Sequence, residues 1–167
     1  MSTQTPELLP FYSFDTSAFI NGRRDLFRPN TFGAIWDAIE DMIKLGSIRA
    51  IDEVKVEVSR QDDEVTKWAK SQRKLFVPLE HDIQYATKEV LAACPRLMAQ
   101  HGGNRNSADP FVIGLALARA GIVVTQETAA NSSNKPRIPD VCVQMKVDWM
   151  SLPDFVDAQG WTIQLGR

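Results

Sequence analysis

The stretch Leu8 to Ile20, LLPFYSFDTSAFI, decides the fold into which the rest of the sequence has to fit. It begins as an apolar, aromatic-rich run, and Asp15 interrupts that run. Aspartate is disfavoured inside β-strands, so we place the carboxyl end of a strand at Asp15. A turn would also accommodate an aspartate. A lone carboxylate at the end of an apolar strand, followed by Thr16 and Ser17, favours a functional site.

A second buried strand is predicted at Ile122-Val123-Val124-Thr125, where β-branched residues follow one another. The almost wholly apolar segment Phe111 to Ala120 precedes it and is expected to form a buried helix, which Gly121 ends. Ser107-Ala108-Asp109-Pro110 has the composition of a helix start, because serine caps, an acid suits the positive helix end, and proline is tolerated in the first turn.

The other segments alternate between helix and strand patterns. Apolar residues recur at helical spacing from Thr31 to Leu45, and Gly46 ends that run. Ser47 to Ile51 is a short candidate strand. Further helices are expected at Asp62–Lys74, at His81–Cys94, from Ile138 and at Leu152–Ala158. A last strand is expected within Met145–Met150. Loops are expected at Arg23–Arg28, Gly102–Asn104 and Ala129–Arg137. This alternation predicts an α/β layer fold with a mainly parallel sheet.

The segment Asp52 to Val58, DEVKVEV, fits two structures. Its alternating valines favour a strand. Asp52 as a helix cap, with Val54 and Val58 on one face, favours a helix. Periodicity alone leans towards the strand.

The composition is that of an ordinary globular domain. The chain has 167 residues, of which 44% are hydrophobic and 24% charged, so we expect residues 1–167 to form one domain. No apolar run reaches the roughly 18 residues of a membrane-spanning helix. The first ten residues lack the basic flank and apolar stretch of a secretion signal. We therefore expect a cytoplasmic protein without a membrane segment.

Any catalysis has to depend on carboxylates. Cys94 and Cys142 are far apart and form no CxxC pair, which argues against a zinc knuckle and a disulfide scaffold. His81 and His101, the only histidines, share no metal-ligand spacing. The net charge of −2 gives no bulk attraction to nucleic acid. It leaves an RNA-cutting enzyme open, because bound cations can neutralise an acidic site.

Four acids are expected to gather beyond the carboxyl ends of the strands, where sites form in open parallel sheets. Asp15 and Glu127 follow predicted strands, Asp109 opens a helix, and Glu57 follows the strand at 47–51. Such a cluster is unfavourable alone, because like charges raise each other's pKa. Mg²⁺ or Mn²⁺ would relieve it, since these cations take oxygen ligands and support phosphodiester hydrolysis. Each acid alone also fits a turn, helix-start or surface role; the combination favours a metal-dependent nuclease.

The same segments resemble PIN domains. Phe14-Asp15-Thr16-Ser17-Ala18-Phe19-Ile20 resembles the family's opening signature, and Val54-Lys55-Val56-Glu57-Val58 resembles the segment that carries its glutamate. Ala108 to Ala116 is similar to the start of its long buried helix, and Val123-Val124-Thr125-Gln126-Glu127 resembles its strand-and-acid segment. With Trp36, Trp68 and the stretch Lys135 to Cys142, nearly the whole chain looks like a PIN-like bacterial family often left without assigned function.

This resemblance implies a three-layer α/β/α sandwich with a helix at Glu57. It also implies a Mg²⁺- or Mn²⁺-dependent ribonuclease, which in many members is the toxin of a type II toxin–antitoxin pair, held inactive by a cognate antitoxin and commonly dimeric. The metal ligands would be Asp15, Glu57 and Asp109, with either Glu127 or Asp140 as the fourth. The choice stays open because Glu127 stands where aspartate is commoner, which lengthens the metal reach by one methylene.

Several polar residues are candidates for substrate binding. Thr16, Ser17 and Thr125 are expected to hydrogen-bond a carboxylate or a phosphate oxygen, although they also fit as ordinary turn and strand-end hydroxyls. Arg23 and Arg24, with Arg28, are expected to guide the RNA backbone, or else to lie in a solvated loop.

Two other classes remain open. A phosphoryl-transfer domain on the same sheet would want Asp-x-Asp-x-Thr after the first strand, but Ser17 stands where the second aspartate belongs. A PIN-like module without catalytic activity, acting as a protein-binding scaffold, is the other alternative.

Overall fold

A parallel five-stranded sheet with β1 (Tyr12–Phe14) at its centre organises the computed structural model, which describes residues 9–99 and 108–166. The strand order is β3-β2-β1-β4-β5, with β2 (Ile48–Ile51) and β4 (Ile122–Val124) beside β1. The edge strands are β3 (Phe76–Val77) and β5 (Trp149–Met150). The chain runs outward from β1 in one direction and then returns to build the other half, so the strand order reverses between β1 and β4. Ligands bind at such a point in open α/β sheets.

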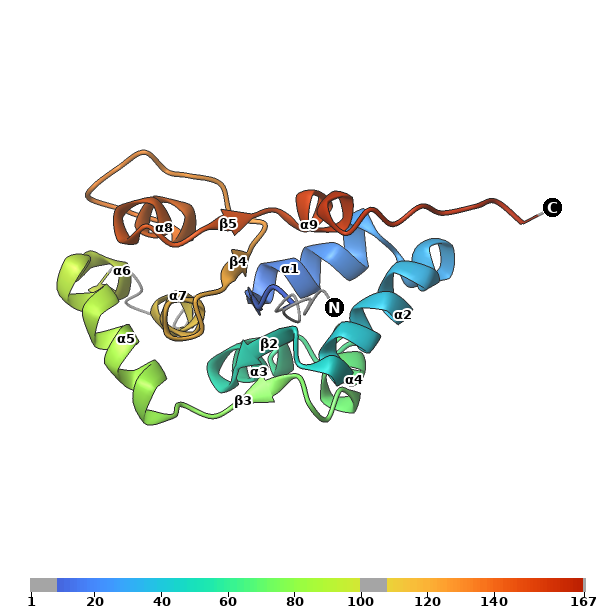
Figure 1. The fold of residues 1–167 in the computed structure, drawn as a ribbon, viewed down its shortest axis with the longest axis horizontal. Coiled ribbons are helices and arrows are strands. Elements are labelled where there is room, and N and C mark those ends of the chain that lie inside the picture. Colours follow the sequence, from blue (N-terminus) through green and yellow to red (C-terminus); the bar gives the residue numbers. More distant parts are fainter. Residues whose placement is uncertain (1–8, 100–107, 167) are drawn as a thin grey trace, which may run out of the picture.

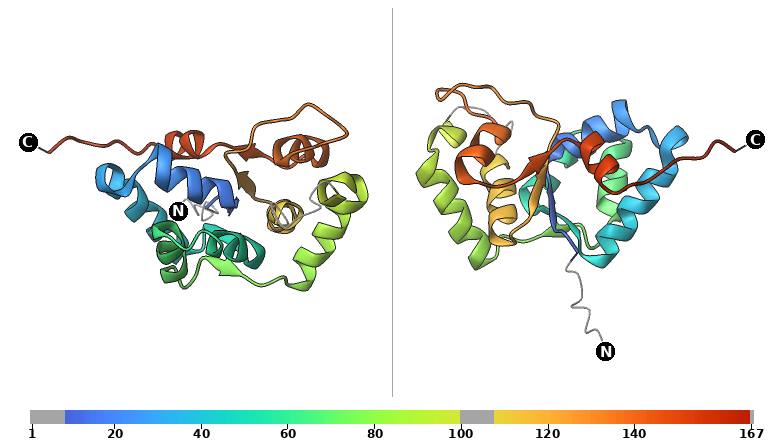
Figure 2. Two further views of the ribbon diagram at one scale, coloured as in Figure 1. Left: turned by 180° about the vertical axis from the view of Figure 1, so that it is seen from behind. Right: turned by 45° about the horizontal axis from the view of Figure 1, so that its top comes forward.

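Helices cover both faces of this sheet. They are α1 (Thr16–Asn21), the π-helical segment η1 (Gly22–Leu26), α2 (Pro29–Leu45), α3 (Asp52–Ser59), α4 (Glu64–Ser71), α5 (His81–Ala93), α6 (Arg96–Ala99), α7 (Asp109–Ala118), α8 (Ile138–Met145) and α9 (Leu152–Ala158). Figure 1 shows α5, α7 and α8 on one side of the strands and α2, α4 and α9 on the other, and the two further views in Figure 2 agree. The predicted α/β/α sandwich is confirmed.

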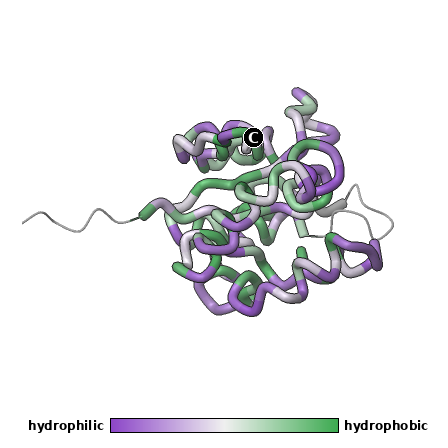
Figure 3. Tube along the Cα trace, turned by 90° about the vertical axis from the view of Figure 1, so that its right-hand side faces the viewer, coloured by the Kyte–Doolittle hydropathy of each residue, from purple (hydrophilic) through white to green (hydrophobic). Residues whose placement is uncertain are grey.

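The central strand is buried on both faces. The hydroxyl of Ser13 donates to the carbonyl of Val112 in α7 at 2.8 Å, and its small size lets that helix approach the sheet closely. Tyr12 and Phe14 point to the opposite face, as alternate strand residues must. There their rings meet the ring of Phe155 edge-on, at 4.8 and 5.2 Å. The trace in Figure 3 has more green, hydrophobic positions in the interior of the molecule and more purple, hydrophilic ones along its outer coils.

The packing of α7 against α5 depends on a glycine. A Cβ at Gly114 would lie 2.2 Å from Oγ1 and 3.0 Å from Cα of Thr87. Only hydrogen at this position lets the two helix backbones come so close. This contact holds α7, and therefore Asp109 at its first turn, in a fixed place beside the sheet.

Most predicted elements are present, and the differences have local causes. The expected loop at Arg23–Arg28 is wrong, since the π-helical segment η1 (Gly22–Leu26) occupies most of it. This segment directly follows α1, which Asp15 caps. The strand favoured by periodicity at Asp52–Val58 is also wrong. The helix α3 forms there because Val54, Glu57 and Val58 share one buried face, while Val56 is 55% exposed.

The short elements β3 and α6 are present in the structure but were not predicted. Two other expectations fall where the structure cannot test them. The loop expected at Gly102–Asn104 and the cap at Ser107 lie outside the described residues. Within residues 9–99 and 108–166, no helix combines the length and the apolar character needed to cross a bilayer.

Candidate metal centre

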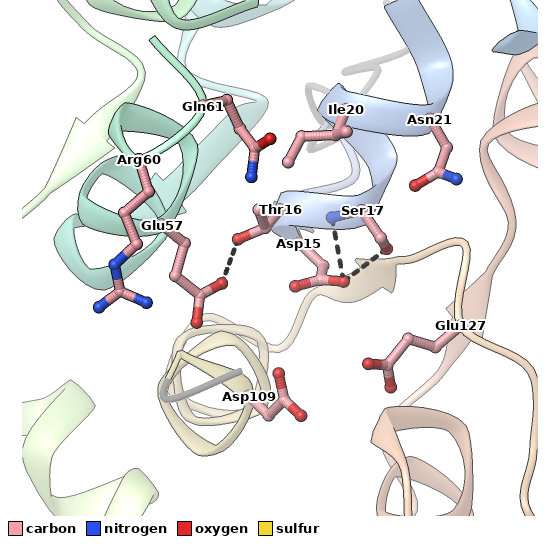
Figure 4. Close-up of a pocket in the computed structure, with 10 residues that line it drawn as sticks. All are labelled: Asp15, Thr16, Ser17, Ile20, Asn21, Glu57, Arg60, Gln61, Asp109 and Glu127. Carbon is pink, nitrogen blue, oxygen red and sulfur yellow. Dashed lines mark hydrogen bonds between the residues drawn. The ribbon is translucent and has the colours of Figure 1, made fainter. Parts of the chain in front are cut away.

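Four carboxylates from separate parts of the chain face one pocket of about 550 Å³ (Figure 4). They are Asp15 after β1, Glu57 in α3, Asp109 at the start of α7 and Glu127 after β4. The pocket is lined by Asp15, Thr16, Ser17, Ile20, Asn21, Glu57, Arg60, Gln61, Asp109 and Glu127. The acids therefore gather beyond the carboxyl ends of the inner strands, at the reversal of strand order.

Asp15 is oriented by two hydroxyl groups. Its Oδ2 atom accepts hydrogen bonds from Ser17 Oγ at 2.6 Å and from Thr125 Oγ1 at 3.0 Å. The same hydroxyls accept from the backbone of the segment after β4: Gln126 N lies 2.9 Å from Ser17 Oγ, and Glu127 N lies 3.1 Å from Thr125 Oγ1. Ser17 and Thr125 therefore connect Asp15 to the segment that carries Glu127.

Glu57 is held at both of its oxygens. Oε2 accepts from Thr16 Oγ1 at 2.6 Å, and Oε1 accepts from the backbone N–H of Ala108 at 3.0 Å. Ala108 precedes Asp109, so this bond joins the segments that carry two of the acids. Glu57 is 8% exposed, which fits a carboxylate fixed in place rather than a solvated surface acid.

Glu127 takes its position from the loop that leads to α8. Its Oε2 atom accepts from the backbone N–H of Ile138 at 3.1 Å. The Glu127 carboxylate points into the pocket, towards Asp109, in Figure 4. Asp109 is only 3% exposed.

The acids repel one another in their buried setting. Burial raises the pKa of Asp109 to about 10, and the charges of Asp15, Glu127 and Glu57 add to that effect. Burial also raises the pKa of Asp15, although its bonds from Ser17 and Thr125 act in the opposite direction. Burial and then the charge of Asp15 raise the pKa of Glu127. The negative potential extends behind the pocket, where burial, Asp15 and Glu127 raise the pKa of the Cys142 thiol to about 12.

The donor set fits a hard divalent cation. All four acids present oxygen atoms, which Mg²⁺ and Mn²⁺ prefer, and a cation would relieve their repulsion. In the part of the chain that the structure describes, no group of three or more His, Cys, Asp or Glu side chains is already arranged as a metal site. Coordination therefore requires side-chain rotation or water molecules as additional ligands, and Mg²⁺ usually keeps several waters.

The prediction for Arg23 needs correction. Arg23 was expected to guide RNA, but its side chain is only 5% exposed and pairs with Glu64. Its guanidinium carbon lies 4.6 Å from the ring centre of Trp36 and 4.4 Å from that of Trp68. Arg23 therefore stabilises the contact of η1 with α2 and α4. Arg24 forms an ion pair with Asp63 and donates to Oε1 of Gln61, a residue that lines the pocket, so its part in guiding RNA stays a prediction.

Asp140 is not gathered with the other acids. Its carboxylate accepts from the backbone N–H groups of Ala130, Asn131 and Arg137 at 2.8–3.0 Å. Although burial acts in the opposite direction, these donors hold the pKa of Asp140 below its ordinary value. It caps α8 and fixes the loop before that helix. Of the two candidates for the fourth ligand, Glu127 is the one that faces the pocket.

Three polar residues of the pocket were not predicted. Arg60 follows Glu57 by three positions in the same helical segment, and Asn21 follows Ser17 by four. Both spacings put the two members of the pair on one helix face. They were missed because the segments that carry them were not assigned as helices from their own pattern. Gln61 has no signal in the sequence, because its place depends on how the chain leaves α3.

A family model matches residues 12–163, a range that includes all four acids. Its description is "Domain of unknown function (DUF4411)". The chain belongs to this family. No curated protein has a sequence that matches it. The fold that the resemblance to PIN domains implied, with helices on both faces of a parallel sheet and the acids at one edge, is the fold the chain has.

Two solved structures are similar over most of the chain. One is VapBC2 from Rickettsia felis bound to a DNA fragment from their promoter, with 12% identity, a TM-score of 0.49, and coverage of 84% of this chain and 98% of that chain. The other is FitAcB from Neisseria gonorrhoeae, with 11% identity, a TM-score of 0.48, and coverage of 85% and 98%. At this level of similarity, neither determines what this chain does.

Proposed function

We propose that this chain is a Mg²⁺- or Mn²⁺-dependent endoribonuclease that hydrolyses RNA phosphodiester bonds. The observation that supports the proposal is the convergence of Asp15, Glu57, Asp109 and Glu127 on one pocket (Figure 4). Burial and neighbouring charges raise the pKa values of Asp15, Asp109 and Glu127, which is unfavourable for folding and makes these acids candidates for a functional site.

The four carboxylates would act as the metal ligands. Asp15 is presented by the hydroxyls of Ser17 and Thr125, and Glu57 by Thr16 and the Ala108 amide, so these two need little reorientation. A bound Mg²⁺ or Mn²⁺ supplies positive charge that polarises the scissile phosphate and activates a water molecule as the nucleophile.

Proton release should accompany metal binding. The metal-free pocket holds protons because burial and like charges raise the pKa of Asp109. A carboxylate has to be ionised to bind a cation, so binding is expected to strengthen as pH rises from 5 to 8. Calorimetry in buffers of different ionisation enthalpy would count the released protons.

The first experiment compares cleavage by the wild type with that by Asp15→Asn. Labelled single-stranded and hairpin RNAs are incubated with Mn²⁺, with Mg²⁺ and with EDTA. The wild type should cut only with metal, Asp15→Asn should be inactive, and Asp157→Asn, a change at an exposed acid of α9, should retain activity. Equal cutting by the wild type and Asp15→Asn would contradict the proposal.

We further propose that the ribonuclease is the toxin of a type II toxin–antitoxin pair, with a cognate antitoxin as its partner, a homodimer as its assembly and the cytoplasm as its location. The resemblance to PIN domains supports this role. Induction of the gene should arrest growth, and co-expression of a neighbouring gene that encodes a small DNA-binding protein should relieve the arrest. Growth that continues while soluble protein accumulates would contradict the toxin role.

A PIN-like module without activity is the second candidate. It is favoured by the glutamate at position 127 and by the absence, within the described residues, of acids already arranged as a metal site. Calorimetry with Mn²⁺ separates the two proposals, since only the nuclease requires binding. A phosphoryl-transfer domain has less support, because Ser17 donates to Asp15 where a second carboxylate would be needed. Binding of beryllofluoride, a mimic of a phosphoryl group, to this protein would favour the phosphoryl-transfer domain.

A further inference from the structure

We infer that the pocket contains a phosphate subsite built on Arg60, which binds a backbone phosphate of the substrate next to the one that is cut. The inference rests on the proposed nuclease function and assigns the part of the site that holds the strand. Arg60 lies at the C-terminal end of α3, and its guanidinium is beside Glu57, on the side of the pocket away from Glu127 (Figure 4).

The charge distribution of the pocket supports a phosphate at this position. Among the residues that the structure describes, Arg60 is the one basic side chain lining the pocket, and the other charged lining residues are the four acids. A metal ion near the acids would attract the scissile phosphate, but a nucleic-acid strand brings further phosphates. Arg60 is exposed as well as lining the pocket, so a neighbouring phosphate of the strand can reach it from solvent.

Arg60 is not needed to orient the nearby carboxylate. Both oxygens of Glu57 already accept hydrogen bonds, from Thr16 and from the Ala108 amide. A guanidinium group presents two parallel N–H donors that match two phosphate oxygens, so arginine is well suited to this contact. Arginine at this place in the pocket can therefore contact a substrate phosphate directly.

Two exposed amide side chains also line the pocket, Gln61 next to Arg60 and Asn21 at the end of α1, across the pocket from Arg60 (Figure 4). The Oε1 atom of Gln61 accepts from Arg24 Nη2 at 3.3 Å. Its amide nitrogen points towards the pocket in Figure 4 and can donate to a phosphate oxygen or a ribose hydroxyl. Gln61 and Arg60 thus offer hydrogen-bond donors on one side of the pocket, as an anionic backbone requires.

The test measures the salt dependence of RNA binding. Fluorescence anisotropy follows a 12-nucleotide, fluorescein-labelled single-stranded RNA with Ca²⁺ in place of Mn²⁺, between 50 and 300 mM KCl. Loss of one phosphate contact lowers the slope of log Kd against log salt by about 0.7 for a single strand. Arg60→Gln should show that decrease, whereas Arg60→Lys should keep the slope and bind more weakly. Arg73→Gln, an exposed arginine outside the pocket, should change neither quantity.

Two further measurements exclude a structural effect. Arg60→Gln should bind Mn²⁺ with unchanged affinity by calorimetry. In cleavage assays its KM should rise by roughly tenfold, the loss expected for one charge-assisted hydrogen bond, with kcat within about twofold of the wild type because the chemistry at the metal is intact.

The outcomes separate this inference from the proposed function. If the wild type cuts RNA and Arg60→Gln keeps the wild-type slope and KM, the subsite is wrong and the nuclease proposal stands. If the wild type binds RNA without cutting it and Arg60→Gln lowers the slope, the subsite stands and the nuclease proposal fails. Absence of RNA binding by the wild type overturns both.

Discussion

Replacement of Asp109 by asparagine is expected to stabilise the metal-free protein. In the folded chain, burial and then the charges of Asp15, Glu127 and Glu57 raise the pKa of Asp109 from 3.8 to about 10. The unfolded chain loses this proton near pH 4, whereas the folded chain keeps it. Above pH 4 the folded state therefore binds more protons than the unfolded state, and its stability falls as pH rises towards 10.

The size of the effect follows from the pH interval. Each pH unit between the two pKa values costs about 1.4 kcal/mol, so the interval from pH 4 to pH 7 costs up to about 4 kcal/mol. Asparagine has the same shape and does not ionise. The unfolding free energy of Asp109→Asn relative to the wild type should therefore increase by up to about 4 kcal/mol between pH 4 and pH 7.

Urea unfolding in EDTA, followed by tryptophan fluorescence at pH 4, 5.5, 7 and 8.5, measures this difference. Asp157→Asn serves as the control, because that acid is exposed and outside the pocket. With Mn²⁺ at about 100 times its Kd, the wild type should gain about 2.7 kcal/mol and Asp109→Asn much less. A difference that stays constant or shrinks as pH rises would refute the reasoning from repulsion.

Three further substitutions test other parts of the structure. Thr16→Val removes the 2.6 Å hydrogen bond to Glu57. Single-turnover cleavage should slow by about tenfold, while the unfolding free energy falls by only about 1 kcal/mol. An unchanged cleavage rate would exclude a role for Thr16. Arg23→Lys removes the planar group that packs against Trp36 and Trp68, and should lower the unfolding free energy by about 2 kcal/mol in urea titrations without weakening RNA binding. Weaker RNA binding at unchanged stability would support the role predicted from the sequence. Gly114→Ala places a methyl group against Thr87 and should lower the free energy of unfolding by about 1–3 kcal/mol, as measured by thermal unfolding. A Tm equal to that of the wild type would contradict the close contact of α5 with α7.

The strands and the acids at their ends were predictable because their signals are local. The apolar run before Asp15 and the β-branched run before Glu127 identify two inner strands without any tertiary information. The place of Asp109 could be predicted for a similar reason, since an acid and a proline mark a helix start. The parallel arrangement then follows, because helices separate the strands.

Other features depend on tertiary contacts that no local pattern shows. Arg23 is buried only because Trp36 and Trp68 approach it from α2 and α4. The strand β3 has two residues and exists through its pairing with β2. At Asp52–Val58 the alternating valines were misleading, because the buried face of α3 selects Val54 and Val58 and leaves Val56 in solvent. The capping role of Asp140 was within reach of the sequence, since Pro139-Asp140 is also a helix start.

The most direct test of the central claim is the anomalous scattering of Mn²⁺ in crystals of the protein grown or soaked with that ion. The account predicts one or two peaks in the pocket, within coordination distance of Asp15, Glu57, Asp109 or Glu127 directly or through water. These peaks should be lost in Asp109→Asn crystals. Ordered carboxylates with no Mn²⁺ between them at saturating concentration, or the ion bound elsewhere, would contradict it.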